Sequence, residues 1–69
     1  MTKTEIGLKA GEIFEFLRQN GECPLSLFET KLKGSRGTIL AAVGWLAREG
    51  KLGFRKEGRT TLVRIISPG

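Results

Sequence analysis

Four short glycine-containing segments divide this chain and so restrict the secondary structure that it can form. They are Asn20-Gly21, Lys33-Gly34, Gly50 and Glu57-Gly58-Arg59, and glycine at such places ends helices or forms turns. The whole chain has 69 residues, which is enough for one small domain with one hydrophobic core and too few for two. We therefore expect a single domain over residues 1–69, ordered from about 5 to 66.

The first three segments have helical periodicity. Between Glu5 and Gln19 apolar residues recur at spacings of four, three and four, which predicts an amphipathic helix. Ser26-Leu27-Phe28-Glu29 has the form of a capping box, which predicts a short helix over 27–32 with Ser26 as its cap. Ser35 is a suitable cap for a third helix over 36–49. The expected core or flanking positions are Ile6, Ala10, Ile13, Leu17, Leu27, Phe28, Leu32, Ile39, Ala42, Val43, Leu46 and Ala47.

Two runs with β propensity follow the third helical segment. Residues 51–56 and 60–66 are separated by Glu57-Gly58-Arg59, which predicts a β-hairpin. A brief edge strand near Cys23–Leu25 is also compatible with the sequence, because the proline holds Cys23 in extended geometry.

Alternation along the hairpin indicates which side chains face the core. On the first strand we expect Leu52 and Phe54 to point inward. On the second strand we favour Val63 and Ile65 as the buried pair, because the opposite choice would bury Arg64. The sequence therefore predicts that one face of the hairpin packs on the helices.

The order of three helices and a terminal hairpin resembles that of a winged helix-turn-helix domain, an α+β fold whose hairpin is the wing. The junction GWLAREGKLGF at residues 44–54 narrows the resemblance, because such domains end the third helix with spaced apolar residues, a charged turn and glycine before an apolar start to the wing. Together with the opening EIGLKAGEIFEFL, it makes the chain similar to small stand-alone prokaryotic winged helix proteins of largely uncharacterised function. The resemblance implies DNA binding in many families and protein contact alone in others.

Residue types that most catalytic sites need are scarce in this chain. It has no histidine and a single cysteine, Cys23, so the commonest general base and metal ligand are absent and no internal disulfide can form. We expect no enzymatic activity, no metal and no cofactor, and we interpret Cys23 as a small apolar residue. No apolar run is long enough for a signal peptide or a membrane span, so we expect a cytoplasmic protein without a membrane partner.

Charge is distributed unevenly between the two parts of the chain. Residues 1–30 hold three basic and five acidic residues, a net charge of −2, whereas residues 31–69 hold nine basic and two acidic residues, a net charge of +7. The basic part is where a polyanion would bind, although a solvated surface without a ligand is the alternative. The expected contacts with double-stranded DNA are Lys33, Arg36, Thr38, Arg48, Arg55, Lys56 and Arg59.

The third helix is poorly equipped to read bases. Its face opposite the core carries Gly37, Ala41, Gly44 and Arg48, without the Asn or Gln that commonly pair with base edges. We therefore expect contacts mainly with phosphate groups, weak sequence preference, and a transcription-related role at most.

The same helix face supports a second hypothesis. Gly37, Ala41 and Gly44 form a strip of small side chains, and Trp45 lies beside it. Such a face could contact a protein partner or a second copy of the chain, with Trp45 as an anchor. For Trp45 we favour a simpler role, in which its ring covers the base of the wing.

Overall fold

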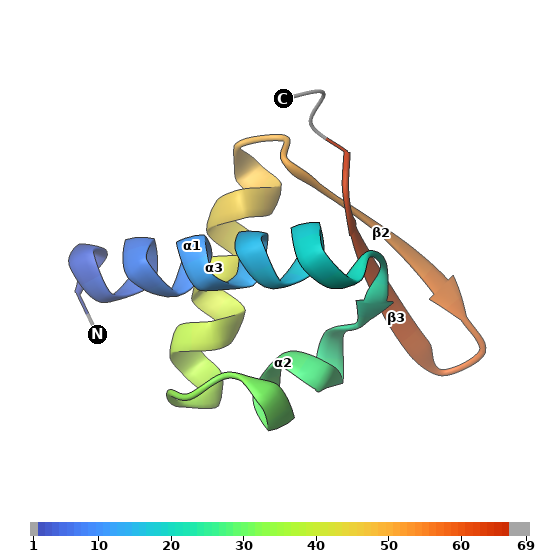
Figure 1. Ribbon diagram of the computed structural model, residues 1–69, viewed down its shortest axis with the longest axis horizontal. Helices are drawn as coiled ribbons and strands as arrows, with labels where there is room; N and C mark the ends of the chain where they lie inside the picture. Colours follow the sequence, from blue (N-terminus) through green and yellow to red (C-terminus); the bar gives the residue numbers. More distant parts are fainter. Residues whose placement is uncertain (1, 67–69) are drawn as a thin grey trace.

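Three helices and a hairpin follow one another along the chain in the computed structural model, which describes residues 2–66 (Figure 1). This order confirms the expected α+β winged helix fold. The elements are α1 (Lys3–Asn20), β1 (Cys23–Pro24), α2 (Leu25–Lys31), α3 (Arg36–Arg48), β2 (Leu52–Glu57) and β3 (Thr60–Ile65).

Side-chain and glycine caps fix the ends of the two longer helices. The Thr2 hydroxyl accepts a hydrogen bond from the Glu5 amide at the start of α1, at 3.1 Å. The Gly21 amide donates to the Leu17 carbonyl at its end, at 2.7 Å, and Gly21 has a φ of 77°. The Ser35 side chain accepts from the Thr38 amide at 3.2 Å, which confirms Ser35 as the cap of α3.

The predicted capping box is wrong. Helix α2 begins at Leu25, so Ser26 lies inside it, and Pro24 stands at the cap position without a side-chain hydrogen bond. The physical reason is the strand before it, because Cys23 pairs with Val63 and Pro24 with Leu62. The helix can start as soon as this pairing ends, and the half-buried Leu25 then packs against the core. The short strand is confirmed over Cys23–Pro24, one residue shorter than expected.

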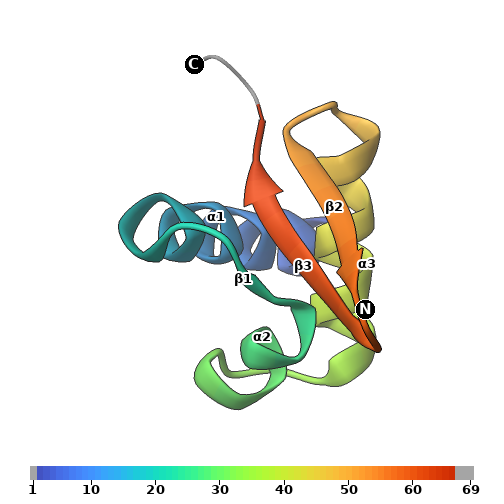
Figure 2. The same cartoon turned by 90° about the vertical axis from the view of Figure 1, so that its right-hand side faces the viewer.

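The sheet has the order β1-β3-β2, and both of its strand pairs are antiparallel (Figure 2). Facing residues of neighbouring strands lie on the same side of a sheet, and successive residues alternate between sides. Because Leu52 and Val63 are buried, their side is the inner face. The inner face carries Leu52, Phe54, Lys56, Thr61, Val63 and Ile65, and the outer face carries Gly53, Arg55, Glu57, Thr60, Leu62 and Arg64.

The core lies between the inner face and the three helices. Its most deeply buried large side chains are Phe28, Ile13, Ile39 and Val63. The choice of Val63 as a buried residue is confirmed, and Ile65 packs against the same cluster. The remaining buried residues are Ala10, Leu17, Cys23, Ala42, Val43, Leu46 and Leu52.

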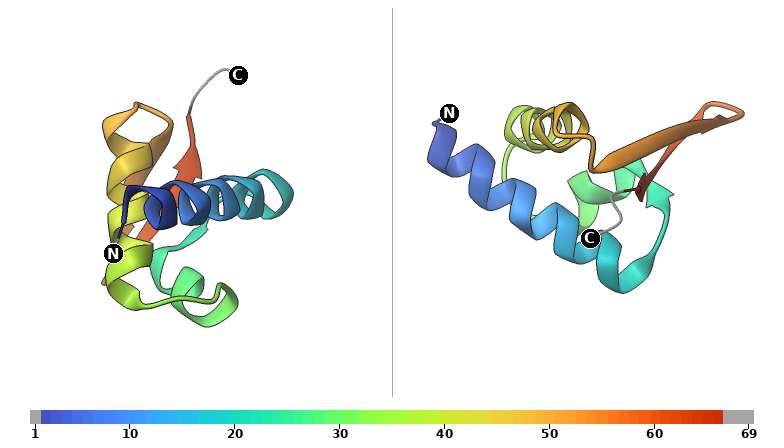
Figure 3. Two further views of the ribbon diagram at one scale, coloured as in Figure 1. Left: turned by 90° about the vertical axis from the view of Figure 1, so that its left-hand side faces the viewer. Right: turned by 90° about the horizontal axis from the view of Figure 1, so that it is seen from above.

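Phe54 lies on the inner face, as expected, but it is not part of the buried core, because 42% of its surface stays exposed. Strand β2 lies at the edge of the sheet, and the hairpin projects away from the helices beyond the core (Figure 3). Only the start of the strand, at Leu52, therefore lies over the helices closely enough to be buried.

Two glycine-to-alanine substitutions should change stability in opposite directions. Gly58 is the first residue of the two-residue hairpin turn and has a φ of 63°, where an L side chain costs about 1–2 kcal/mol. Gly44 is helical, and an added Cβ there meets no atom within 4 Å. We expect Gly58→Ala to lower the free energy of unfolding by about 1 kcal/mol and Gly44→Ala to raise it by about 0.5–1 kcal/mol. Urea denaturation followed by circular dichroism measures both, and a change of the same sign in the two variants would contradict the assignment.

Candidate nucleic-acid interface

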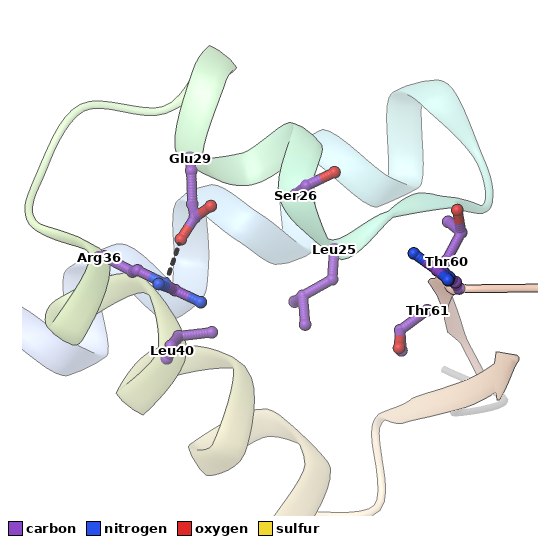
Figure 4. A pocket seen from close by; sticks show the side chains of 8 residues that line it. Leu25, Ser26, Glu29, Arg36, Leu40, Thr60 and Thr61 are labelled. Atoms are coloured by element: carbon purple, nitrogen blue, oxygen red, sulfur yellow. Dashed lines mark ion pairs between the residues drawn. The ribbon is translucent and has the colours of Figure 1, made fainter.

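A shallow cavity of about 240 Å³ lies between α2, the start of α3 and the tip of the hairpin (Figure 4). We call it the wing cavity. Its apolar lining consists of Leu25 and the 40% exposed Leu40. Its polar lining comes from three elements and the hairpin turn, and consists of Ser26, Glu29, Arg36, Arg59, Thr60 and Thr61.

An ion pair between two helices forms one wall of the wing cavity. The Arg36 Nε lies 2.7 Å from the Glu29 Oε1, and the two side chains remain 78% and 36% exposed. Figure 4 shows the pair between the end of α2 and the start of α3. Exposed pairs of this kind contribute little to stability, at most about 1 kcal/mol. Arg36 therefore faces the cavity with a weakly held partner.

Strand alternation separates the three basic residues that the sequence groups at the wing. Lys56 lies on the inner face of the hairpin, whereas Arg55 lies on the outer face. Arg59 is in the turn and lines the wing cavity together with Arg36. Two of the expected contacts, from α3 and from the wing, are thus brought to one site.

Arg55 is engaged in a network on the outer face. Its Nη2 lies 2.8 Å from the Glu22 Oε1, and its Nη1 lies 2.8 Å from the Glu57 Oε2. The hydrogen bond from Arg55 lowers the pKa of Glu22, and the hydrogen bonds to Glu22 and Glu57 raise the pKa of Arg55. The network joins the wing to the segment before β1 and neutralises a cation that the sequence assigns to DNA.

The remaining expected contacts lie apart from the wing cavity. Arg48 is exposed in the last turn of α3, beside Trp45, and is about 18 Å along the helix from Arg36 at 1.5 Å per residue. Thr38 faces α1, and its hydroxyl lies 3.0 Å from that of Ser35. Lys33 is exposed in the turn between α2 and α3, where its carbonyl accepts a hydrogen bond from Lys9.

Sequence reasoning missed four polar residues of the wing cavity. The capping-box pattern gives Ser26 and Glu29 a role in starting a helix, so the sequence does not indicate that they line a binding site. Thr60 and Thr61 directly follow the hairpin turn, and this position beside Arg59 is the one signal in the sequence. Their meeting with α2 depends on the short pairing between β1 and β3, which alternation alone does not reveal.

The surface of the second hypothesis is also solvent-facing. Gly37 and Gly44 are exposed, and an added Cβ would meet only the Ser35 Oγ, at 3.9 Å from Gly37. Trp45 is 42% exposed and borders a shallow groove with Gly7 and Gly11 of α1. The same groove reaches Lys51, the residue directly before β2, and the role of Trp45 as a cover for the base of the wing stays a prediction.

The described part of the chain contains neither a cluster of metal ligands nor a membrane-spanning helix. Within residues 2–66, His, Cys, Asp and Glu side chains form no group of three that could hold a metal ion. No helix in that range is both long and apolar enough to cross a membrane. Burial raises the pKa of the Cys23 thiol, which favours the neutral form and agrees with its interpretation as a small apolar residue.

The pKa of Glu22 provides a test of the Arg55 network. The ordinary value of 4.5 is lowered in the folded protein, so the network stabilises the fold above that value and is lost as the pH falls through the lowered pKa. We expect Arg55→Gln to raise the pKa of Glu22, as measured by NMR titration of its carboxyl carbon. Glu15, whose pKa of about 2 depends on Arg18, is the internal control and should not change. An unchanged Glu22 titration would show that the network is not formed in solution.

Comparison with known proteins identifies a family to which this chain is similar. The family described as "Winged helix-turn-helix domain (DUF2582)" matches residues 1–65. No curated protein and no solved structure matches the chain. The matched range covers every helix and strand of the structure, and the chain therefore belongs to the DUF2582 family of winged helix-turn-helix domains.

Proposed function

We propose that this domain binds double-stranded DNA mainly through phosphate groups, with weak sequence preference. The observation that carries the proposal is the meeting of Arg36 from α3 with Arg59 from the wing in one cavity. When winged domains bind DNA, the third helix enters the major groove and the wing meets the backbone. A duplex docked in this way would place phosphate groups between these two elements.

The side chains of α3 support weak sequence preference. Its exposed face offers the small Gly37 and Gly44, which allow close approach, and Arg48 as the long basic side chain of its last turn. Specific readout needs bidentate side chains at several base edges. Phosphate contacts position a protein without carrying sequence information, so they would supply most of the affinity here.

The proposal includes a non-enzymatic, transcription-related role in the cytoplasm, without a cofactor. Membership of a winged helix family supports a DNA-binding or interaction module. The absence of histidine from the sequence also favours binding over acid–base catalysis.

Removing two cations from the wing should weaken DNA binding and reduce its salt dependence. We expect Lys56→Gln combined with Arg59→Gln to lower the affinity for a labelled random duplex. The slope of log K against log salt concentration should fall by about 2, roughly one for each phosphate group that the variant no longer neutralises. Arg55→Gln should have a smaller effect, because Arg55 lies on the outer face and is paired with Glu22 and Glu57. Fluorescence anisotropy over a range of salt concentrations measures both quantities.

The matched control removes two charges elsewhere. Lys3→Gln combined with Arg18→Gln changes the net charge equally on α1, away from the wing cavity. An equal decrease of affinity in the two double variants would show that net charge, and not the position of the charges on the wing, determines the affinity. A wild-type protein that binds no duplex at low salt would contradict DNA binding itself.

A second candidate function is protein contact or homodimerisation through α3. The observation that favours it is the exposure of Trp45, at 42%, beside the uncovered Gly44. Exposed aromatic residues often anchor protein interfaces, and the small residues would let another backbone approach. This function would need neither the wing nor its charges.

Light scattering tests self-association through this face. If α3 mediates a dimer, the wild-type mass should be twice that of a monomer, and Ala41→Glu should return it to the monomer by placing a charge in the contact. Glu15→Gln on α1 is a control outside the face. A monomeric wild type, or a dimer that is indifferent to Ala41→Glu, would exclude this homodimer. Trp45 is the single tryptophan of the sequence, so its fluorescence reports directly on the same contact.

A further inference from the structure

We propose that the wing cavity is a phosphodiester-binding subsite in which Glu29 competes with the phosphate group for Arg36. This inference rests on the proposed DNA binding and deepens it, because it names the group that is bound and the residue that limits the binding. The residue is Glu29, whose carboxylate forms an ion pair with Arg36 at the wall of the cavity.

The lining of the wing cavity matches the chemistry of a phosphodiester. Arg36 and Arg59 offer guanidinium groups, which bind phosphate oxygens through paired N–H donors. Ser26, Thr60 and Thr61 add three hydroxyl groups, and hydroxyl groups commonly donate to backbone phosphates of DNA. Neighbouring phosphate groups of a strand docked over the cavity could therefore be contacted from α2, α3 and the wing.

The Glu29 carboxylate already occupies the position beside Arg36 where a phosphate group would bind. Its Oε1 lies 2.7 Å from the Arg36 Nε, a charge-assisted hydrogen-bond distance that a phosphate oxygen would also adopt. The exposed fractions of Arg36 and Glu29, 78% and 36%, leave the pair open to solvent and weakly held. A duplex whose phosphate groups engage Arg59 as well as Arg36 can therefore displace the carboxylate.

The competing carboxylate affects which ligands bind. A single phosphate ion gains little, because it must separate Arg36 from Glu29 and brings no further charges to the wing. A duplex brings several phosphate groups, so contacts with Arg59 and Lys56 offset that separation. We infer that Glu29 weakens binding of small anions relative to binding of a polyanion that spans α3 and the wing.

Affinity for a labelled random duplex at low salt tests the competition. We expect Glu29→Gln to tighten binding by about threefold to tenfold, because it frees Arg36 for phosphate and removes a negative charge beside it. Glu15→Gln is the matched control, since it takes the same charge from a carboxylate that pairs with an arginine, Arg18, but on α1 and away from the wing cavity. It should tighten binding by less than about twofold. Equal effects of the two substitutions would overturn the subsite while leaving DNA binding in place.

NMR with inorganic phosphate tests the subsite without DNA. In Glu29→Gln we expect the Nε–H signals of Arg36 and Arg59 to shift with a saturable millimolar dependence, and more strongly than in the wild type. The exposed Arg48, in the last turn of α3, is the reference signal. Equal shifts at all three arginines would overturn the proposal, because they would show unselective ion binding. Selective shifts in a protein that binds no duplex would support the phosphate subsite and reject the proposed DNA function, so the two failures are distinguishable.

Discussion

The pairing of β3 with strands on both of its sides is the constraint on which the rest of the structure depends. Val63 at its centre is fully buried and faces Cys23 on one side and Phe54 on the other. The pair with Cys23 is part of a strand of only two residues, yet it fixes where α2 starts and brings α2 beside the hairpin. Without that pairing, Ser26 and Glu29 would have no fixed position relative to the wing, and the wing cavity would not form.

Alternation along the hairpin then determines which charges can act together. Lys56 and Arg55 are adjacent in sequence but lie on opposite faces, and only the outer one meets Glu22. The charge of +7 in residues 31–69 therefore overstates the field that a duplex would meet, because Arg36 and Arg55 each have a carboxylate partner. The sequence gives the number of basic residues in a segment. The fold determines how many of them face a ligand without a neighbouring carboxylate.

The parts of this fold that local chemistry determines could be predicted from the sequence. The apolar spacing of α1, the Ser35 cap and the glycine in the hairpin turn depend on residues close together in the chain, and the sequence predicts all three. The capping box failed because Ser26 follows a strand that pairs with residues about forty positions later, and the exposure of Phe54 depends on how far the hairpin extends beyond the helices. Contacts between Glu22 and Arg55, 33 residues apart, likewise arise only from tertiary structure.

The two ion pairs have different consequences for the proposed DNA binding because of where they lie. The Glu22 and Arg55 pair connects the wing to the segment before β1, so it fixes the wing in position before any ligand arrives, and binding then costs less conformational freedom. The Glu29 and Arg36 pair lies within the wing cavity itself, so a ligand must replace it. One pair thus orders the site and the other opposes its occupation. Binding would therefore respond to the number of phosphate groups engaged at once rather than to the strength of any single contact.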